Sequence, residues 1–77
     1  MVWVFMHEES TSLRNSIIKT VKSKIPGTHM YMSRVPDQED SVGRKKSVFF
    51  YALNLADAKF IIHIITKIRK ERSNVQV

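Results

Sequence analysis

In residues 43–59, GRKKSVFFYALNLADAK, a basic segment, an apolar run and a helix start follow one another. Residues 47–53, SVFFYAL, are rich in aromatic residues and too few for a typical helix, which indicates a β-strand. Asn54 has the side chain of a helix N-cap, and Asp57 stands three residues later in an approximate capping box. We therefore predict a strand followed at once by a helix over about residues 55–72.

The predicted C-terminal helix has an apolar face and a basic face. The apolar arc consists of Phe60, Ile61, Ile64, Ile65 and Ile68, and the basic stripe consists of Lys59, His63, Lys67 and Lys70. We expect the apolar arc to pack against a sheet. The basic stripe, together with Arg69 and Arg72, is either a phosphate-binding track, a surface for an acidic partner or an ordinary solvated helix face.

Three further elements precede this pair. Residues 2–6, VWVFM, form an unbroken apolar run that predicts a strand at the centre of its sheet. Residues 12–25 predict a helix, because apolar residues recur at helical spacing after the hydroxyl-rich ESTS and Pro26 with Gly27 ends the pattern. Residues 28–35, THMYMSRV, predict a second strand that forms a long-tipped hairpin with the third.

The order of these elements predicts the fold class. Strand, helix, strand, strand and helix, with SNVQV at residues 73–77 as a short closing strand, describe an α+β protein. We expect a ferredoxin-like split βαβ sandwich, βαββα(β), with an antiparallel sheet and two helices on one face. Seventy-seven residues make a single domain, 1–77, near the lower limit for a self-sufficient core.

The amino-acid composition limits the classes of function and of partner that suit this chain. Thirteen Lys and Arg against seven Asp and Glu give a net charge of +6, which favours nucleic acid or an acidic protein surface as partner. The sequence has no Cys, which excludes disulfides and a thiol nucleophile. Its apolar runs fall short of the roughly 18–20 residues that cross a bilayer, so we expect a soluble cytoplasmic or nuclear protein with no membrane partner.

Catalytic and metal motifs are not evident in the sequence. His7, His29 and His63 lack the spacing of a metal site, and neither a glycine-rich phosphate loop nor a nucleophile elbow is present. We predict a non-enzymatic protein with no catalytic residues, metal or cofactor.

Aromatic residues are spread over all three predicted strands. They are Trp3, Phe5, Tyr31, Phe49, Phe50 and Tyr51. Because side chains alternate along a strand, both faces of the sheet are apolar, and the face without helices needs a cover. That cover is nucleic acid, a second copy of the chain or another protein. Arg34, Arg44, Lys45 and Lys46 lie beside these strands, where they either neutralise phosphates or form a solvated loop tip.

The order and several residues resemble an RNA-recognition motif, whose first and third strands carry bases on aromatic side chains. VWV resembles its first strand, and VPDQEDSVGRKKSVFFYAL resembles its second loop and third strand. The resemblance implies that Trp3 lies on the open face, that Phe50 takes a stacking position and that Lys46 takes a basic position. Ser47, Val48 and Phe49 depart from the family's pattern.

A weaker resemblance links the chain to small ACT-type regulatory domains, which have the same order of elements. HMYMSRVPDQEDSVGRKKSVFF is similar to their second and third strands, and KERSNVQV to their last strand. That resemblance implies an amino-acid ligand at the turn after the first strand, HEESTS, although this turn has no glycine.

The preferred interpretation is a protein that binds single-stranded nucleic acid, RNA rather than DNA, through an aromatic sheet face and basic residues. The expected binding residues are Trp3, Phe5, Tyr31, Arg34, Arg44, Lys45, Lys46, Phe50, Lys59, Lys67 and Lys70. One alternative is a regulatory protein-interaction module or homodimer that uses the same sheet face or the basic helix. The other is an ACT-type amino-acid sensor.

Overall fold

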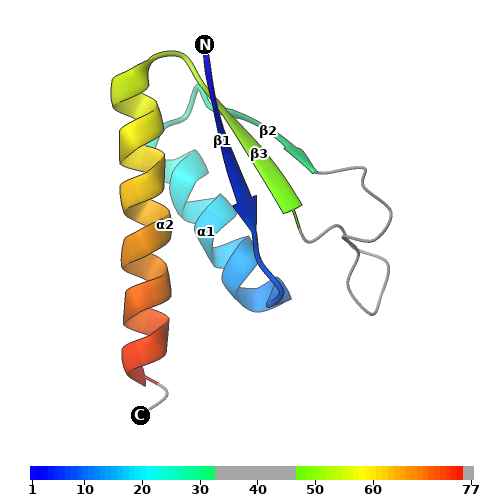
Figure 1. Ribbon diagram of the computed structural model, residues 1–77, viewed down its shortest axis with the longest axis vertical. Helices are drawn as coiled ribbons and strands as arrows, with labels where there is room; N and C mark the ends of the chain where they lie inside the picture. Colours follow the sequence, from blue (N-terminus) through cyan, green and yellow to red (C-terminus); the bar gives the residue numbers. More distant parts are fainter. Residues whose placement is uncertain (33–46, 76–77) are drawn as a thin grey trace.

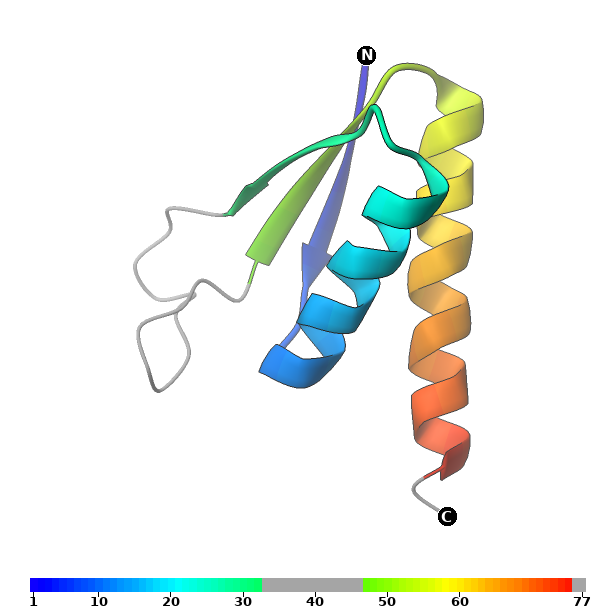
Figure 2. The ribbon, with the colours of Figure 1, turned by 180° about the vertical axis from the view of Figure 1, so that it is seen from behind.

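The computed structural model describes residues 1–32 and 47–75, with the side chains of all but 31, 32, 74 and 75. Its elements are β1 (Val2–His7), α1 (Thr11–Lys24), β2 (His29–Met32), β3 (Ser47–Ala52) and α2 (Leu55–Val75). The strands form one three-stranded sheet. Figure 1 shows both helices on one side of this sheet, and Figure 2 shows the same two layers from behind. The α+β class and the predicted order of the first five elements are confirmed.

The sheet has the strand order β1-β3-β2, and both pairings are antiparallel. The β1 strand pairs with β3 in unbroken register, from Val2 opposite Ala52 to His7 opposite Ser47. The prediction that the VWVFM run forms a central strand is therefore wrong, because β3 is central and β1 lies at an edge of the described sheet. A continuous apolar run reflects apolar side chains on both faces of a strand, and it does not report how many strands lie beside it.

The C-terminal helix is longer than predicted. It continues to Val75, so residues 73–75 are helical and the expected closing strand over 73–77 does not form there; residues 76 and 77 lie outside the described part. The physical reason is local, since Ser73 and Asn74 follow the last basic turn without a glycine or proline to end the helix.

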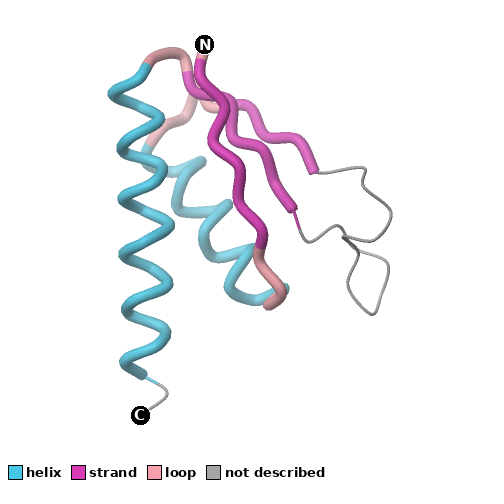
Figure 3. Tube along the Cα trace, viewed as in Figure 1, coloured by secondary structure: helices cyan, strands magenta, loops and turns pink. Residues whose placement is uncertain are grey.

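The core lies between the sheet and the two helices. Its buried apolar residues are Val4, Met6, Ile17, Val21, Val48, Phe50, Ala52, Ala58, Ile61, Ile64 and Ile65. Figure 3 shows α1 and α2 as neighbours on one side of the strands. Phe60 was expected in the apolar arc that packs against the sheet. This prediction is wrong, because Phe60 is an exposed residue of α2.

Both helices begin at side-chain caps. Ser10 Oγ accepts a hydrogen bond from the Leu13 amide at 3.2 Å, and Asn54 Oδ1 accepts one from the Asp57 amide at 2.9 Å. The prediction of Asn54 as N-cap is confirmed. The chain also leaves α1 as predicted, with Ile25 as the C-cap directly before Pro26.

We expect Asn54→Ala to lower the free energy of unfolding by about 1 kcal/mol, because it removes the acceptor for an amide in the first turn of α2. Urea unfolding followed by circular dichroism measures the change. Asn15→Ala is the matched control, since Asn15 is an exposed residue within α1 and alanine favours a helix interior. Equal stability of the two variants would contradict a role for Asn54 in capping.

Candidate nucleic-acid interface: the open face of the sheet

The two phenylalanines at the centre of β3 lie on opposite faces of the sheet. Phe50 has 0% of its surface exposed and stands opposite Val4 in the core, on the helix side. The expectation that Phe50 shares the open face with Trp3 is therefore wrong. The register places Phe49 opposite Phe5 and Tyr51 opposite Trp3, and residues directly opposite one another in an antiparallel pair share a face.

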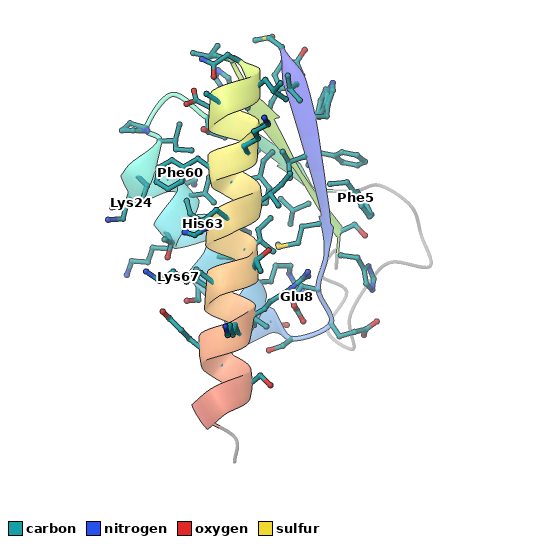
Figure 4. The ribbon with its side chains drawn as sticks, turned by 60° about the vertical axis from the view of Figure 1, so that its left-hand side comes forward. Phe5, Glu8, Lys24, Phe60, His63 and Lys67 are labelled. Carbon is teal, nitrogen blue, oxygen red and sulfur yellow. The ribbon has the colours of Figure 1, made fainter. Side chains whose placement is uncertain are left out.

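Four aromatic side chains gather on the face that the helices leave uncovered. This aromatic face consists of Trp3, Phe5, Phe49 and Tyr51. Trp3 is 52% exposed and Phe5 is 57% exposed, whereas Phe49 and Tyr51 are half-buried between them and β2. Figure 4 shows Phe5 pointing away from α2.

The rings of the aromatic face pack against one another. Trp3 lies with its ring centroid 4.0 Å from that of Tyr51 at an interplanar angle of 52°. It also meets Phe49 edge to face, at 5.6 Å and 89°, and Phe5 lies 5.1 Å from Phe49. Tilted and edge-to-face contacts of this kind favour particular relative orientations of the rings. Trp3 and Phe5 remain exposed within this arrangement.

Two rows of register-paired residues cross the sheet from β2 through β3 to β1. One row consists of His29, Tyr51 and Trp3, and the other consists of Tyr31, Phe49 and Phe5. The exposed His29 was not among the expected binding residues. Tyr31 was among the expected binding residues. The register places its backbone opposite Phe49, and its side chain lies outside the described part.

The structure separates the expected cations into two groups. Lys59, Lys67 and Lys70 are exposed residues of α2, and the core and the sheet stand between that helix and the aromatic face. The other cations, Arg34, Arg44, Lys45 and Lys46, lie outside the described residues. The described residues therefore do not bring the basic stripe and the aromatic face together.

An open groove of about 590 Å³ runs between α1 and α2. Its lining residues are Ser16, Thr20, Lys24, Phe60, His63, Ile64, Lys67, Ile68, Glu71 and Arg72. Figure 4 shows Phe60, His63 and Lys67 on the side of α2 that faces Lys24. The groove was not predicted from the sequence, which indicated His63 and Lys67 only as part of a basic helix face. Nothing in the sequence indicated that this face of α2 lies beside Ser16 and Thr20 of α1.

Two arginines hold the turn between β1 and α1. The buried Arg14 donates through Nη1 to the Glu8 backbone oxygen at 2.7 Å and through Nη2 to Thr11 Oγ1 at 3.1 Å. From α2, Arg69 donates to Glu8 Oε1 at 3.1 Å and to the His7 backbone oxygen at 2.7 Å. This is the turn at which the ACT-type resemblance implies a ligand, and here the chain's own guanidinium groups occupy it.

A serine, a histidine and a glutamate form a chain of contacts beside that turn. His7 Nδ1 lies 3.1 Å from Ser47 Oγ, and His7 Nε2 lies 3.0 Å from Glu9 Oε1. The residue types are those of a nucleophile, a base and an orienting acid. Ser47 has 0% of its surface exposed, so a substrate carbonyl has no approach to its hydroxyl in this structure. The contacts instead join the end of β1 to the start of β3.

Within residues 1–32 and 47–75, no three His, Asp or Glu side chains gather as metal ligands. None of the helices in this part of the chain is both long and apolar enough to cross a membrane. No family model matches the sequence, and no match was found among curated proteins or solved structures.

Proposed function

We propose that this protein is a non-enzymatic binding protein whose aromatic face engages unpaired bases of single-stranded nucleic acid, with RNA as the preferred partner. The observation that carries the proposal is the gathering of Trp3, Phe5, Phe49 and Tyr51 on the one sheet face that no helix covers. An apolar surface of this kind on a small domain marks a site of contact with a partner.

Stacking explains why a nucleic acid suits this surface. Every base has a π-face, and stacking on an aromatic side chain contributes about 1–3 kcal/mol per base without requiring a particular sequence. Trp3 and Phe5 offer the most accessible rings, and the ring of Phe49 packs against both. Unpaired RNA is commonly recognised in this way, whereas the bases of a duplex are already stacked on one another.

The cations that suit this proposal precede β3 in the sequence. Arg44, Lys45 and Lys46 come directly before Ser47, the first residue of β3, and Arg34 follows two residues after β2. Cations near the ends of the strands would neutralise the phosphates of a strand whose bases lie on the aromatic face. Lys59, Lys67 and Lys70 are not assigned to this contact, because they lie on the helix layer.

We infer that the architecture is a ferredoxin-like split βαβ sandwich, related in form to an RNA-recognition motif, of which the described residues form three strands and two helices. Since β1 and β2 both run antiparallel to β3, they are parallel to each other and β3 lies between them. This is the arrangement of a split βαβ unit. In the motif named above, the first and third strands carry the stacking residues, and β1 and β3 carry the aromatic face here.

Fluorescence anisotropy of a labelled, mixed-sequence single-stranded RNA tests the proposed function. We expect Trp3→Ala to weaken binding by about 1–3 kcal/mol, roughly 5- to 150-fold, because one stacking platform is lost. Phe60→Ala is the matched control, since it removes an exposed aromatic ring from the helix layer. It should leave the affinity nearly unchanged.

Two further measurements separate stacking from simple attraction of charges. Binding of the wild-type chain should fall as salt rises, and duplex DNA at the same salt should bind more weakly than the single strand. Circular dichroism verifies that each variant is folded. If Trp3→Ala and Phe60→Ala bind equally well, or if the wild-type chain does not bind single strands at low salt, the proposal is wrong.

A further inference from the structure

The outer edge of β1 has the features of a docking site for another strand. Within the described residues, β1 pairs with β3 alone and forms one edge of the sheet. Every second residue of an edge strand directs its backbone N–H and C=O away from the sheet, where they can pair with another extended chain. Soluble proteins normally protect such edges with lysine, proline, a bulge or a very short strand. The six residues VWVFMH contain no lysine or proline, and their register with β3 has no bulge.

The helix flank beside this edge is also apolar and exposed. Leu55, Ile62 and Arg69 are spaced by seven residues, so they lie along one flank of α2. Arg69 reaches the end of β1, with bonds to the His7 backbone oxygen and to Glu8, which shows that this flank faces β1. Leu55 is 59% exposed and Ile62 is 52% exposed. Exposed apolar side chains therefore accompany the β1 edge in both layers of the molecule.

We propose that the β1 edge is an interface that binds a second copy of this chain, with the two β1 strands antiparallel and a two-fold axis at Val4. This places Val4 opposite Val4 of the second copy, Trp3 opposite its Phe5, and Val2 opposite its Met6. The result is a continuous six-stranded sheet with all four helices on one side. The aromatic faces of the two copies join across the axis, so each copy contributes to one extended surface.

The choice of a second copy rests on symmetry and charge. Any antiparallel edge can pair with its own copy about a two-fold axis, and the same faces of both sheets align only when the axis passes through a residue. An axis at Val4 pairs the apolar run 2–6 entirely with itself. An axis at Phe5 would place Val2 opposite Glu8, whose carboxylate binds Arg69. Residues 2–6, Leu55 and Ile62 are uncharged, and the guanidinium of Arg69 on the same flank is paired with Glu8, so the apolar part of the contact adds no charge to two chains of net charge +6.

Sedimentation of the full chain across a range of concentrations, without nucleic acid, tests whether it forms a dimer. We expect a mass that rises from one chain to two. Ile62→Glu should weaken self-association roughly tenfold or more, because a two-fold axis introduces the change twice. Phe60→Glu is the matched control, since it makes the same substitution two residues away on the groove side of α2, and it should associate as the wild type does.

Disulfide formation tests the register, which is possible because the natural chain has no Cys. Opposite residues in an antiparallel pair have Cα atoms about 4.5–5.5 Å apart, within disulfide range. A mixture of Trp3→Cys and Phe5→Cys chains should therefore form a cross-linked dimer under mild oxidation. Each variant alone should do so far less, because its cysteines are offset by two residues along the strands.

The outcomes are distinct from those of the RNA experiment, because neither test here contains nucleic acid. A chain that remains monomeric at every concentration overturns the proposal, and so does an Ile62→Glu variant that associates as strongly as Phe60→Glu. Cross-linking of Phe5→Cys with itself, in place of the mixture, overturns the axis at Val4.

Discussion

Phe50→Ala should lower the free energy of unfolding by about 3–5 kcal/mol, the range observed when a buried aromatic residue is truncated to alanine. Phe50 is fully buried beside Val4 on the helix side of the sheet, so the substitution leaves a cavity that the surrounding core fills only in part. A domain of this size has a total stability of about 5–15 kcal/mol, so a large fraction of the variant is expected to be unfolded at 37 °C. Urea and thermal unfolding measure the effect.

Phe49→Ala is a closely matched control, because it deletes the same ring one residue away on the open face. Its loss of stability should be clearly smaller, since Phe49 is only half-buried and its ring contacts are with Trp3 and Phe5. The proposed function adds a second expectation: Phe49→Ala stays folded and binds RNA more weakly. If Phe49→Ala proved the more destabilising of the two, the register of β3 described above would be wrong.

Arg14→Met should also destabilise the fold strongly. The substitution keeps an unbranched apolar side chain in a buried position but removes the donors that bond Glu8 O and Thr11 Oγ1. Each buried acceptor that loses its donor costs about 1–3 kcal/mol, so we expect a decrease on the order of 2–4 kcal/mol once water has access to part of the turn. Urea unfolding measures it.

Arg69→Met is the companion variant at the same turn. Arg69 also bonds Glu8 and the His7 backbone, but it is exposed, so water replaces the lost donors and the expected cost is at most about 1 kcal/mol. Hydrogen exchange of amides in residues 7–10 should increase in both variants, and more in Arg14→Met. Equal stabilities would mean that burial of Arg14 does not determine its contribution.

The elements could be predicted from the sequence where the local pattern was strong. The capped amphipathic helices, the stop at Pro26 and the apolar run of β3 all follow from short-range rules, and the structure has each of them. The edge position of β1 could not be predicted, because strand order depends on which segments meet in space and an apolar run is compatible with either place.

A shift of β3 by one residue would exchange the residues of the aromatic face with those of the core. Alternation indicated that Phe49 and Phe50 point in opposite directions, but local sequence does not say which of them faces the helices. The pairing of Val4 with Phe50 decides it. Arg14 was missed for a different reason, since an arginine on a helix usually indicates a solvated position and its burial follows from a turn formed by other residues.

The pairing of β1 with β3 has a consequence for how the chain matures during synthesis. Ser47 lies 40 positions after its partner His7, and Arg69 lies 61 positions after its partner Glu8. A ribosome therefore releases the most apolar strand long before its hydrogen-bonding neighbour exists, and the early fragment exposes VWVFM to aggregation or to a chaperone. Folding should become cooperative only after β3 and most of α2 have left the exit tunnel, so stalled fragments that end before residue 47 should be protease-sensitive.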